Sequence, residues 1–132
     1  MKKIIALIIT AFAAWSADAQ DIKTSSLNWT AGELTDLKTG KTKAYSGVFE
    51  TSSEQSVVWK QKAATTTFQV TGMEGSWTDV KTDGKVIFQV DSEGITGTLT
   101  LERSSSGTFV TLDLDLGSGS TMKHRYRIEK VE

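Results

Sequence analysis

The chain contains no cysteine and no proline, and it has a single histidine among 132 residues. The lack of cysteine excludes disulfides, thiol catalysis and cysteine-ligated metal centres. With one histidine, no zinc site of three or four protein ligands is expected, and neither a metal nor a cofactor is predicted. The lack of proline leaves long stretches free to form uninterrupted strands. A hydrophobic core alone must therefore stabilise the fold.

The sequence also lacks an excess of positive charge. Its 15 basic and 16 acidic residues fall to 13 and 15 when Lys2, Lys3 and Asp18 of the N-terminal segment are set aside, so the remaining net charge is −2. A protein that binds nucleic acid usually carries a basic face of matching size. Nucleic acid is therefore not an expected partner.

The long hydrophobic run lies at the N-terminus. "MKK" supplies positive charge, "IIALIITAFAAW" an apolar stretch, and "ADA" a cleavage site of small residues. This order is typical of a bacterial secretory signal peptide rather than of a membrane anchor. We predict cleavage near Ala19–Gln20, which makes residues 1–19 the signal and residues 20–132 a single domain. The mature protein is expected in the periplasm or outside the cell, with no transmembrane segment.

Beyond the signal, apolar and polar residues alternate with a period of two, the pattern of strands with one wet face. The clearest examples are KVIFQV (85–90), GITGTLTLE (94–102) and TFVTLDLDL (108–116). Weaker patterns predict strands over 46–52, 56–62 and 65–71 and two further ones in SLNWTA and ELTDLKTG. With the final strand KHRYRIEKV, this makes about nine in all. The links are short, and the pair Asp83–Gly84 is typical of a type I′ hairpin turn.

Successive strands joined by short turns pair with one another, which makes an antiparallel up-and-down meander. An isolated sheet must protect its edge strands, and closure into a barrel removes the edges altogether. We therefore predict an all-β domain that forms a closed or nearly closed barrel of about eight to ten strands. A two-sheet β-sandwich is the alternative.

The last hairpin, LDLDLGSGSTMKHRYRIE (112–129), can be aligned by matching apolar residues across the strands. This matching predicts a three-residue loop centred on Gly119, with Leu114 opposite His124 on the inner face. Acidic residues then oppose basic ones on the outer face as a charge ladder, in the pairs Asp115–Lys123 and Asp113–Arg125. His124 is on the inner face, either as a core residue or as a polar contact for a ligand.

Eight side chains are candidates for lining an internal pocket. Asp79 and Lys81 are included because SWTDVK, if it is a strand, places both charges on the inner face beside Trp77. Either a bulge rotates this strand, or the two charges line a cavity and orient a ligand. The eight candidates are Trp59, Phe68, Trp77, Asp79, Lys81, Phe88, His124 and Tyr126.

The signal peptide, the hairpin meander and the final strand KHRYRIEKV resemble those of small lipocalin-like and fatty-acid-binding-protein-like barrels, over Leu27 to Val131. Lipocalins carry a Gly-x-Trp motif on their first strand, whereas Gly75 to Trp77 of this chain fall in mid-sequence. Fatty-acid-binding proteins carry an Arg-x-Tyr motif near the C-terminus, where this chain has Arg125-Tyr126-Arg127. The resemblance implies a calycin-type barrel and a hydrophobic ligand.

Three classes of function are compatible with these features. The leading one is a secreted, non-enzymatic binding module that holds a small apolar or amphipathic ligand. The second is a structural or interaction domain of the bacterial envelope, with a solid core and a protein or carbohydrate partner. The third is a small hydrolase built around His124, although no Gly-x-Ser-x-Gly motif is present and no catalytic residue is predicted.

Overall fold

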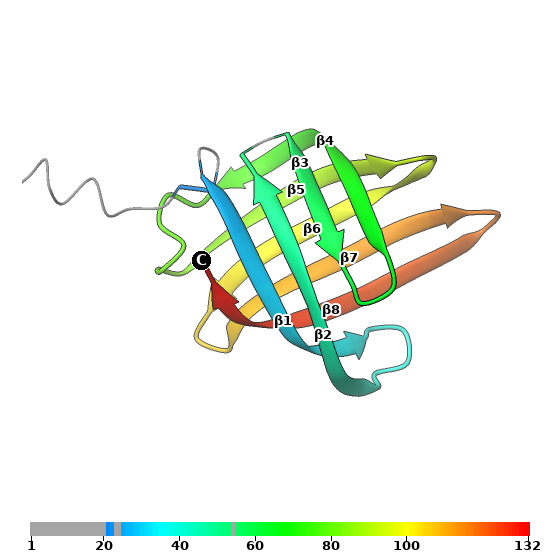
Figure 1. Cartoon of the computed structure of the whole chain (residues 1–132), viewed down its shortest axis with the longest axis horizontal. Coiled ribbons are helices and arrows are strands. Elements are labelled where there is room, and N and C mark those ends of the chain that lie inside the picture. The colour runs from blue at the N-terminus through cyan, green and yellow to red at the C-terminus, as the bar shows by residue number, and fades with distance from the viewer. Residues whose placement is uncertain (1–20, 23–24, 54) are drawn as a thin grey trace, which may run out of the picture.

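The computed structural model describes residues 21–22, 25–53 and 55–132, so the predicted signal peptide lies outside the described residues. None of the described residues is helical, and eight antiparallel strands follow one another until the last pairs with the first (Figure 1). The predicted all-β meander closing into a barrel is confirmed. The strands are β1 (Ser26–Asp36), β2 (Thr42–Ser52), β3 (Ser56–Lys60), β4 (Thr65–Ser76), β5 (Gly84–Ser92), β6 (Ile95–Ser104), β7 (Gly107–Gly117) and β8 (Ser120–Val131).

Alternate residues of the strands point into the barrel and fill it. Along β5, for example, Val86, Phe88 and Val90 are buried while their neighbours are partly or fully exposed, as the alternation predicted. An eight-stranded barrel is just wide enough for inward side chains to meet across it. The buried side chains form one hydrophobic cluster, whose largest fully buried members include Trp29, Phe49, Phe68, Phe88, Leu99 and Leu112. The middle of the barrel is therefore a solid core.

The first strand differs from the prediction. SLNWTA and ELTDLKTG were expected to be two strands, but residues 26–36 form the single strand β1 and residues 37–40 belong to the turn after it. The register of β1 shifts between Ala31 and Glu33 against both of its neighbours, which places a bulge at Gly32. A bulge bends a strand without ending it, and it breaks the alternation that identifies strands in a sequence. The barrel therefore has eight strands instead of about nine.

Residues 77–83 form a loop, so the predicted strand in SWTDVK and the predicted Asp83–Gly84 turn are both wrong. The Thr82 N–H donates to the Asp79 carbonyl (3.0 Å), and the Lys81 N–H donates to Asp79 Oδ1 (3.0 Å). These bonds hold a local turn outside the sheet. Asp79 and Lys81 consequently lie in a surface loop and do not enter the barrel.

This loop and Ile22 seal one end of the barrel, which we call the sealed end. Ile22 is fully buried, and its N–H donates to the Trp77 carbonyl (3.1 Å). The Trp77 ring packs against Trp29, with 5.6 Å between ring centroids, and Trp29 Nε1 donates to the buried Thr51 Oγ1 (3.0 Å). A Cβ on Gly84 would stand 2.3 Å from the Trp77 ring. Gly84 is thus required for close packing of the indole and not for a turn.

The β7–β8 hairpin keeps its predicted faces but has a different register. Ser118 and Gly119 have positive φ angles of 53° and 80° and form a two-residue turn, where a three-residue loop was predicted. Leu112 therefore lies opposite His124, two residues away from the predicted partner. A shift of two residues leaves every side chain on the same face, so apolar matching cannot distinguish the two registers.

The predicted charge ladder on this hairpin is also wrong. Asp113 lies opposite Lys123 and Asp115 opposite Thr121, while Arg125 lies opposite Thr111. Neither aspartate has an ion pair within 4.0 Å among the described residues. Asp115 Oδ1 instead accepts the Gly117 N–H (2.9 Å) at the bulge before the turn, and the Arg125 guanidinium stacks 3.6 Å above the Phe109 ring.

Candidate functional site

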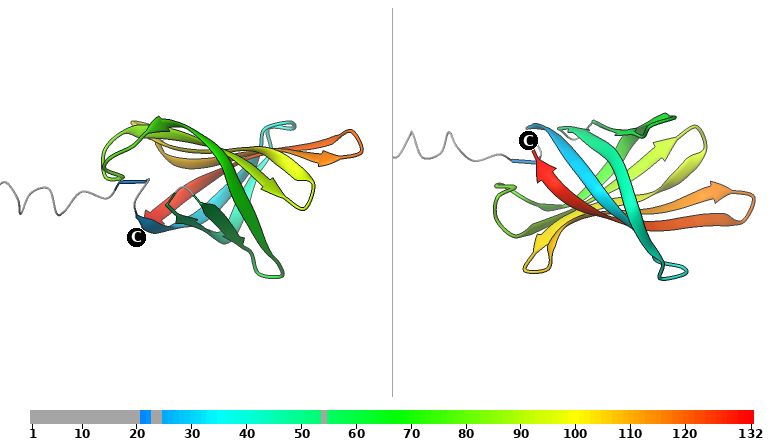
Figure 2. Two further views of the ribbon diagram at one scale, coloured as in Figure 1. Left: turned by 90° about the horizontal axis from the view of Figure 1, so that it is seen from above. Right: turned by 60° about the horizontal axis from the view of Figure 1, so that its bottom comes forward.

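The end of the barrel opposite the sealed end carries the β1–β2, β3–β4, β5–β6 and β7–β8 turns, and we call it the mouth. Figure 2 shows these hairpins spreading apart as they leave the barrel. The wall is incomplete here because β3 has only 5 residues beside the 11 of β2. β2 pairs with β3 only from Val48 to Ser52, so its first half, residues 42–47, has β1 as its strand neighbour on one side only.

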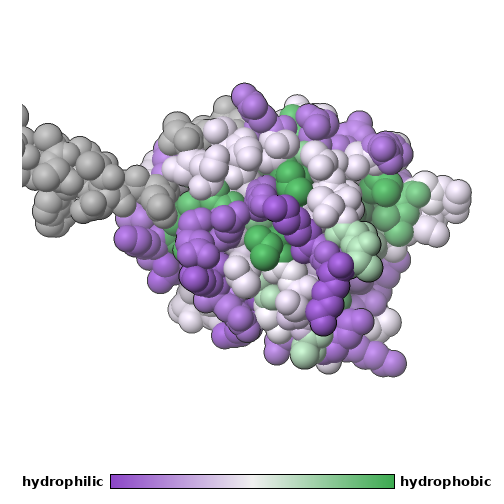
Figure 3. All heavy atoms as spheres, viewed as in Figure 1, coloured by the Kyte–Doolittle hydropathy of each residue, from purple (hydrophilic) through white to green (hydrophobic). Residues whose placement is uncertain are grey.

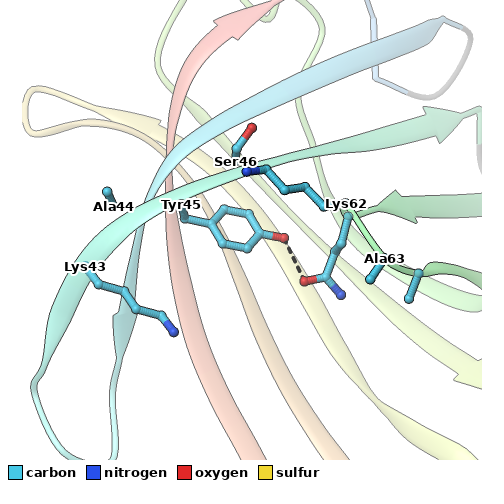
Figure 4. A pocket seen from close by; sticks show the side chains of 8 residues that line it. Lys43, Ala44, Tyr45, Ser46, Lys62 and Ala63 are labelled. Carbon is cyan, nitrogen blue, oxygen red and sulfur yellow. Dashed lines mark hydrogen bonds between the residues drawn. The ribbon is translucent and has the colours of Figure 1, made fainter.

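A hollow of about 590 Å³ opens beside this half of β2 (Figure 4). Tyr45 projects from β2 toward the 61–64 loop, as the close-up shows. Its hydroxyl donates to Gln61 Oε1 (3.0 Å) and accepts the Trp59 Nε1–H (2.9 Å), so the phenol is held in place across the gap. The residues that line the hollow are Lys43, Ala44, Tyr45, Ser46, Gln61, Lys62, Ala63 and Ala64.

Behind Tyr45 lies a cluster of aromatic rings. The Tyr126 ring lies 4.9 Å from that of Tyr45, 5.1 Å from that of Phe49 and 5.8 Å from that of Trp59, measured between centroids. Phe49 stacks on Trp59 at 5.6 Å with an angle of 8° between the planes. Phe49, Trp59 and Tyr126 are buried, whereas Tyr45 is half-buried. These rings form a packed apolar surface beneath the mouth, which we call the aromatic floor. Tyr45 is the ring of this cluster that solvent can reach.

Gly47 makes the position of Tyr45 possible. It is buried on the inner face of β2, and a Cβ there would stand 2.6 Å from the Tyr45 hydroxyl oxygen and 2.8 Å from a ring carbon. Carbon atoms do not approach so closely without displacement. The ring can lie along the barrel wall only because residue 47 has no side chain.

A second hollow of about 390 Å³ lies at the mouth on the other side of Lys43. His124 Nδ1 is 3.3 Å from the Tyr126 hydroxyl oxygen, and its Nε2 is 4.0 Å from Asp36 Oδ2. The imidazole is part-exposed between a hydroxyl and a carboxylate, so it can donate or accept a hydrogen bond toward a bound molecule. The lining residues are Leu34, Asp36, Thr39, Lys41, Thr42, Lys43 and His124.

The two tyrosines of the mouth are neutral at physiological pH. Burial raises the pKa of Tyr126 well above its ordinary value of 10.0, and the charge of a nearby ionised Tyr45 raises it further. Burial also raises the pKa of Tyr45, although the hydrogen bond from Trp59 opposes this effect. Both phenols therefore act as hydrogen-bonding groups and as apolar rings, not as charged groups.

The structure does not bring the eight predicted pocket residues together. Trp59, His124 and Tyr126 lie at the mouth. Phe68 and Phe88 are buried in the solid core. Trp77 packs at the sealed end, and Asp79 and Lys81 lie in the loop beside it.

Three residues of the hollow were not among the predicted site residues, namely Tyr45, Lys43 and Gln61. The strand containing Tyr45 was predicted to begin at residue 46, although the inward series Tyr45, Gly47, Phe49 extends it by period-two alternation. That extension could have found Tyr45. No local pattern could have found its exposure, which depends on the shortness of β3.

Within the described ranges, no group of three or more His, Cys, Asp or Glu side chains could hold a metal ion. None of the described segments is a helix long and apolar enough to cross a membrane.

Known proteins give no match. Comparison with protein families, curated proteins and solved structures finds nothing similar to this chain. The candidate site therefore rests on the geometry of the mouth alone.

Proposed function

We propose that this chain is a secreted, non-enzymatic binding module that holds a small amphipathic molecule at the mouth of its barrel. The proposal rests on the position of Tyr45. Its half-buried ring lies on the aromatic floor beside a hollow of about 590 Å³. Small-molecule sites are commonly concave, mostly apolar and roughly 300–1,000 Å³ in size, with a few fixed polar groups. The signal-like N-terminal segment supports a periplasmic or extracellular location.

The solid core supports a ligand position at the mouth and not deep inside the barrel. A flat apolar portion fits against the Tyr45 ring and the methyl groups of Ala63 and Ala64. A polar portion then has Gln61 or Lys43 within the same hollow. These contacts favour an amphipathic ring compound over a long aliphatic chain, because the interior positions that a chain would occupy already hold side chains.

A second candidate function is a structural or interaction domain, and the solid core is the observation that favours it. Such a domain needs no ligand and uses its surface instead. Figure 3 shows a largely hydrophilic face over β1 to β3, with hydrophobic side chains only in small separate patches. A broad apolar interface on this face is therefore not supported, because stable interfaces have a hydrophobic centre.

Tryptophan fluorescence can test the proposed function, because Trp59 lies at the mouth while Trp29 and Trp77 lie at the sealed end. The probe is 8-anilinonaphthalene-1-sulfonate, an aromatic amphipath. We expect it to quench tryptophan emission, Trp59→Phe to remove most of the quenching and Trp77→Phe to retain it. Tyr45→Ala should weaken binding about tenfold through loss of one aromatic contact.

Lys81→Ala serves as the matched control, because this exposed residue lies at the sealed end. Equal quenching in the Tyr45→Ala, Lys81→Ala and unmodified proteins would place the dye elsewhere and refute the mouth as a binding site. Native mass spectrometry of the protein from its own host provides the second measurement. A bound mass that Tyr45→Ala loses supports the proposal, and apoprotein alone contradicts it.

A further inference from the structure

The first half of β2 is a sheet edge of the barrel. On one side, Thr42, Lys43 and Ala44 pair with Thr35, Leu34 and Glu33 of β1. On the other side, the ladder with β3 begins only at Val48. In the described part of the chain, no backbone hydrogen bond joins residues 42–47 to a partner on that side. The open edge is thus six residues long and lies at the mouth.

The backbone groups that face the opening can be assigned from the β1–β2 hairpin. The Asp36 N–H donates to the Lys41 carbonyl (2.8 Å), so residue 41 turns its polar groups toward β1. In an antiparallel strand, the backbone N–H and C=O groups of successive residues point to opposite sides. The backbone N–H and C=O groups of Thr42, Ala44 and Ser46 therefore point away from β1, and all three residues are exposed. Each offers one donor and one acceptor to an added strand.

The hollow of about 590 Å³ lies directly along this edge, between β2 and the 61–64 loop. Neighbouring strands lie about 4.7–4.9 Å apart, so an added strand runs within the hollow and not above it. The side chains of Ala44, Ala63 and Ala64 are small and leave this space open. An extended peptide can pair its backbone with such an edge, which supplies affinity, while its side chains supply specificity.

The charge beside the edge selects the partner. Lys41, Lys43 and Lys62 are exposed there, and the residues that line the hollow include two lysines and no carboxylate. A second copy pairing edge to edge would bring two sets of these lysines close together, and like charges in close proximity destabilise a strand pair. An acidic polypeptide meets the lysines with opposite charge. We infer that the open edge of β2 accepts one added strand from an extended acidic polypeptide.

This inference uses the same hollow as the proposed small-molecule site, but it rests on the backbone of residues 42–46 and the lysine charges and not on the Tyr45 ring. The test is amide NMR of the ¹⁵N-labelled protein with a seven-residue peptide that alternates glutamate and valine. We expect shifts and slowed hydrogen exchange at Thr42, Ala44 and Ser46. The same peptide with N-methyl groups on alternate amides should not bind, because methylation removes its donors.

Two variants separate backbone pairing from charge attraction. Ala44→Pro removes an edge N–H that the β1 ladder does not use, and it should abolish binding of the peptide. Lys43→Glu combined with Lys62→Glu should weaken binding about tenfold, whereas the matched double reversal Lys81→Glu and Lys85→Glu, away from the mouth, should change it less than twofold. The N-methylated peptide gives the same information as Ala44→Pro without altering the protein.

Three outcomes would overturn the inference. A peptide alternating lysine and valine that binds equally well excludes charge selection. An N-methylated peptide that binds equally well excludes strand pairing. A concentration-dependent dimer with protected amides at Thr42, Ala44 and Ser46 assigns the edge to a second copy. Tyr45→Ala should weaken dye binding about tenfold and leave the peptide shifts in place, so failure of one proposal is distinguishable from failure of the other.

Discussion

Substituting alanine for Gly47 should expel Tyr45 from the mouth while leaving the barrel closed. The added Cβ would stand 2.6 Å from the Tyr45 hydroxyl oxygen, and no positive φ prevents residue 47 from carrying a side chain. The displaced ring loses its hydrogen bonds to Trp59 and Gln61 and its contact with Tyr126. The Gly47→Ala variant thus tests whether the aromatic floor holds Tyr45 as the structure indicates.

The expected cost follows from these contacts. Each neutral hydrogen bond contributes roughly 1 kcal/mol and the aromatic contact roughly 1 kcal/mol more. Alanine in a strand recovers roughly 0.5–1 kcal/mol relative to glycine. The net loss in the free energy of unfolding is therefore about 2 kcal/mol, which lowers the melting temperature of a domain of this size by about 8 °C.

Urea unfolding of Gly47→Ala, Tyr45→Ala and the double variant provides the assay. Without the Tyr45 ring, the alanine at position 47 meets no obstacle and should be neutral or stabilising by about 0.5–1 kcal/mol. The two substitutions should therefore show a coupling energy of about 2–3 kcal/mol. If Gly47→Ala costs the same 2 kcal/mol or so in both backgrounds, the Cβ meets something other than Tyr45 and the reasoning is refuted.

Burial raises the pKa of Tyr126 above 10.0, so its stabilisation is fully present below that pH and is lost as the pH rises beyond it. Tyr126→Phe should therefore flatten the fall in unfolding free energy above about pH 10, as urea unfolding can measure. Ile22→Ala should lower the unfolding free energy by about 3 kcal/mol because Ile22 is fully buried, and dye binding at the mouth should persist in thermally intact protein. Thr51→Val leaves the Trp29 indole N–H buried without an acceptor and should cost about 2 kcal/mol by the same unfolding assay, whereas Thr51→Ser should cost less.

The sequence predicted those strands whose burial follows one simple rule. Along β5, β6 and β7 one face is wet and the other is buried, so period-two alternation identified both the strands and their inward residues. β1 departs from the rule because its bulge at Gly32 interrupts the alternation in mid-strand. The register of β7 with β8 depends on the turn at Ser118 and Gly119, and apolar matching does not encode that turn.

The candidate site was harder to predict because its exposure is not a local property. His124 was correctly placed on the inner face, but the sequence could not tell whether that position lay in the core or at an opening. His124 lies at the opening because it is close to the mouth end of β8, where the hairpins spread apart. Its side chain is accordingly 24% exposed. Tyr45 owes its accessibility to β3, a strand 5 residues long, which leaves the wall beside it open.

The closure of the barrel also determines how the mouth is oriented if the protein is attached through its C-terminus. Asn28 and Glu132 exchange two backbone hydrogen bonds (2.8 and 3.0 Å), so the C-terminus lies beside the start of β1 at the sealed end (Figure 1). A tether at the C-terminus is therefore attached at the sealed end, and the mouth points away from the point of attachment. A short linker from Glu132 to the start of β1 should also allow a circular permutant with new ends at the Glu93–Gly94 turn, since all eight ladders of the barrel would be retained.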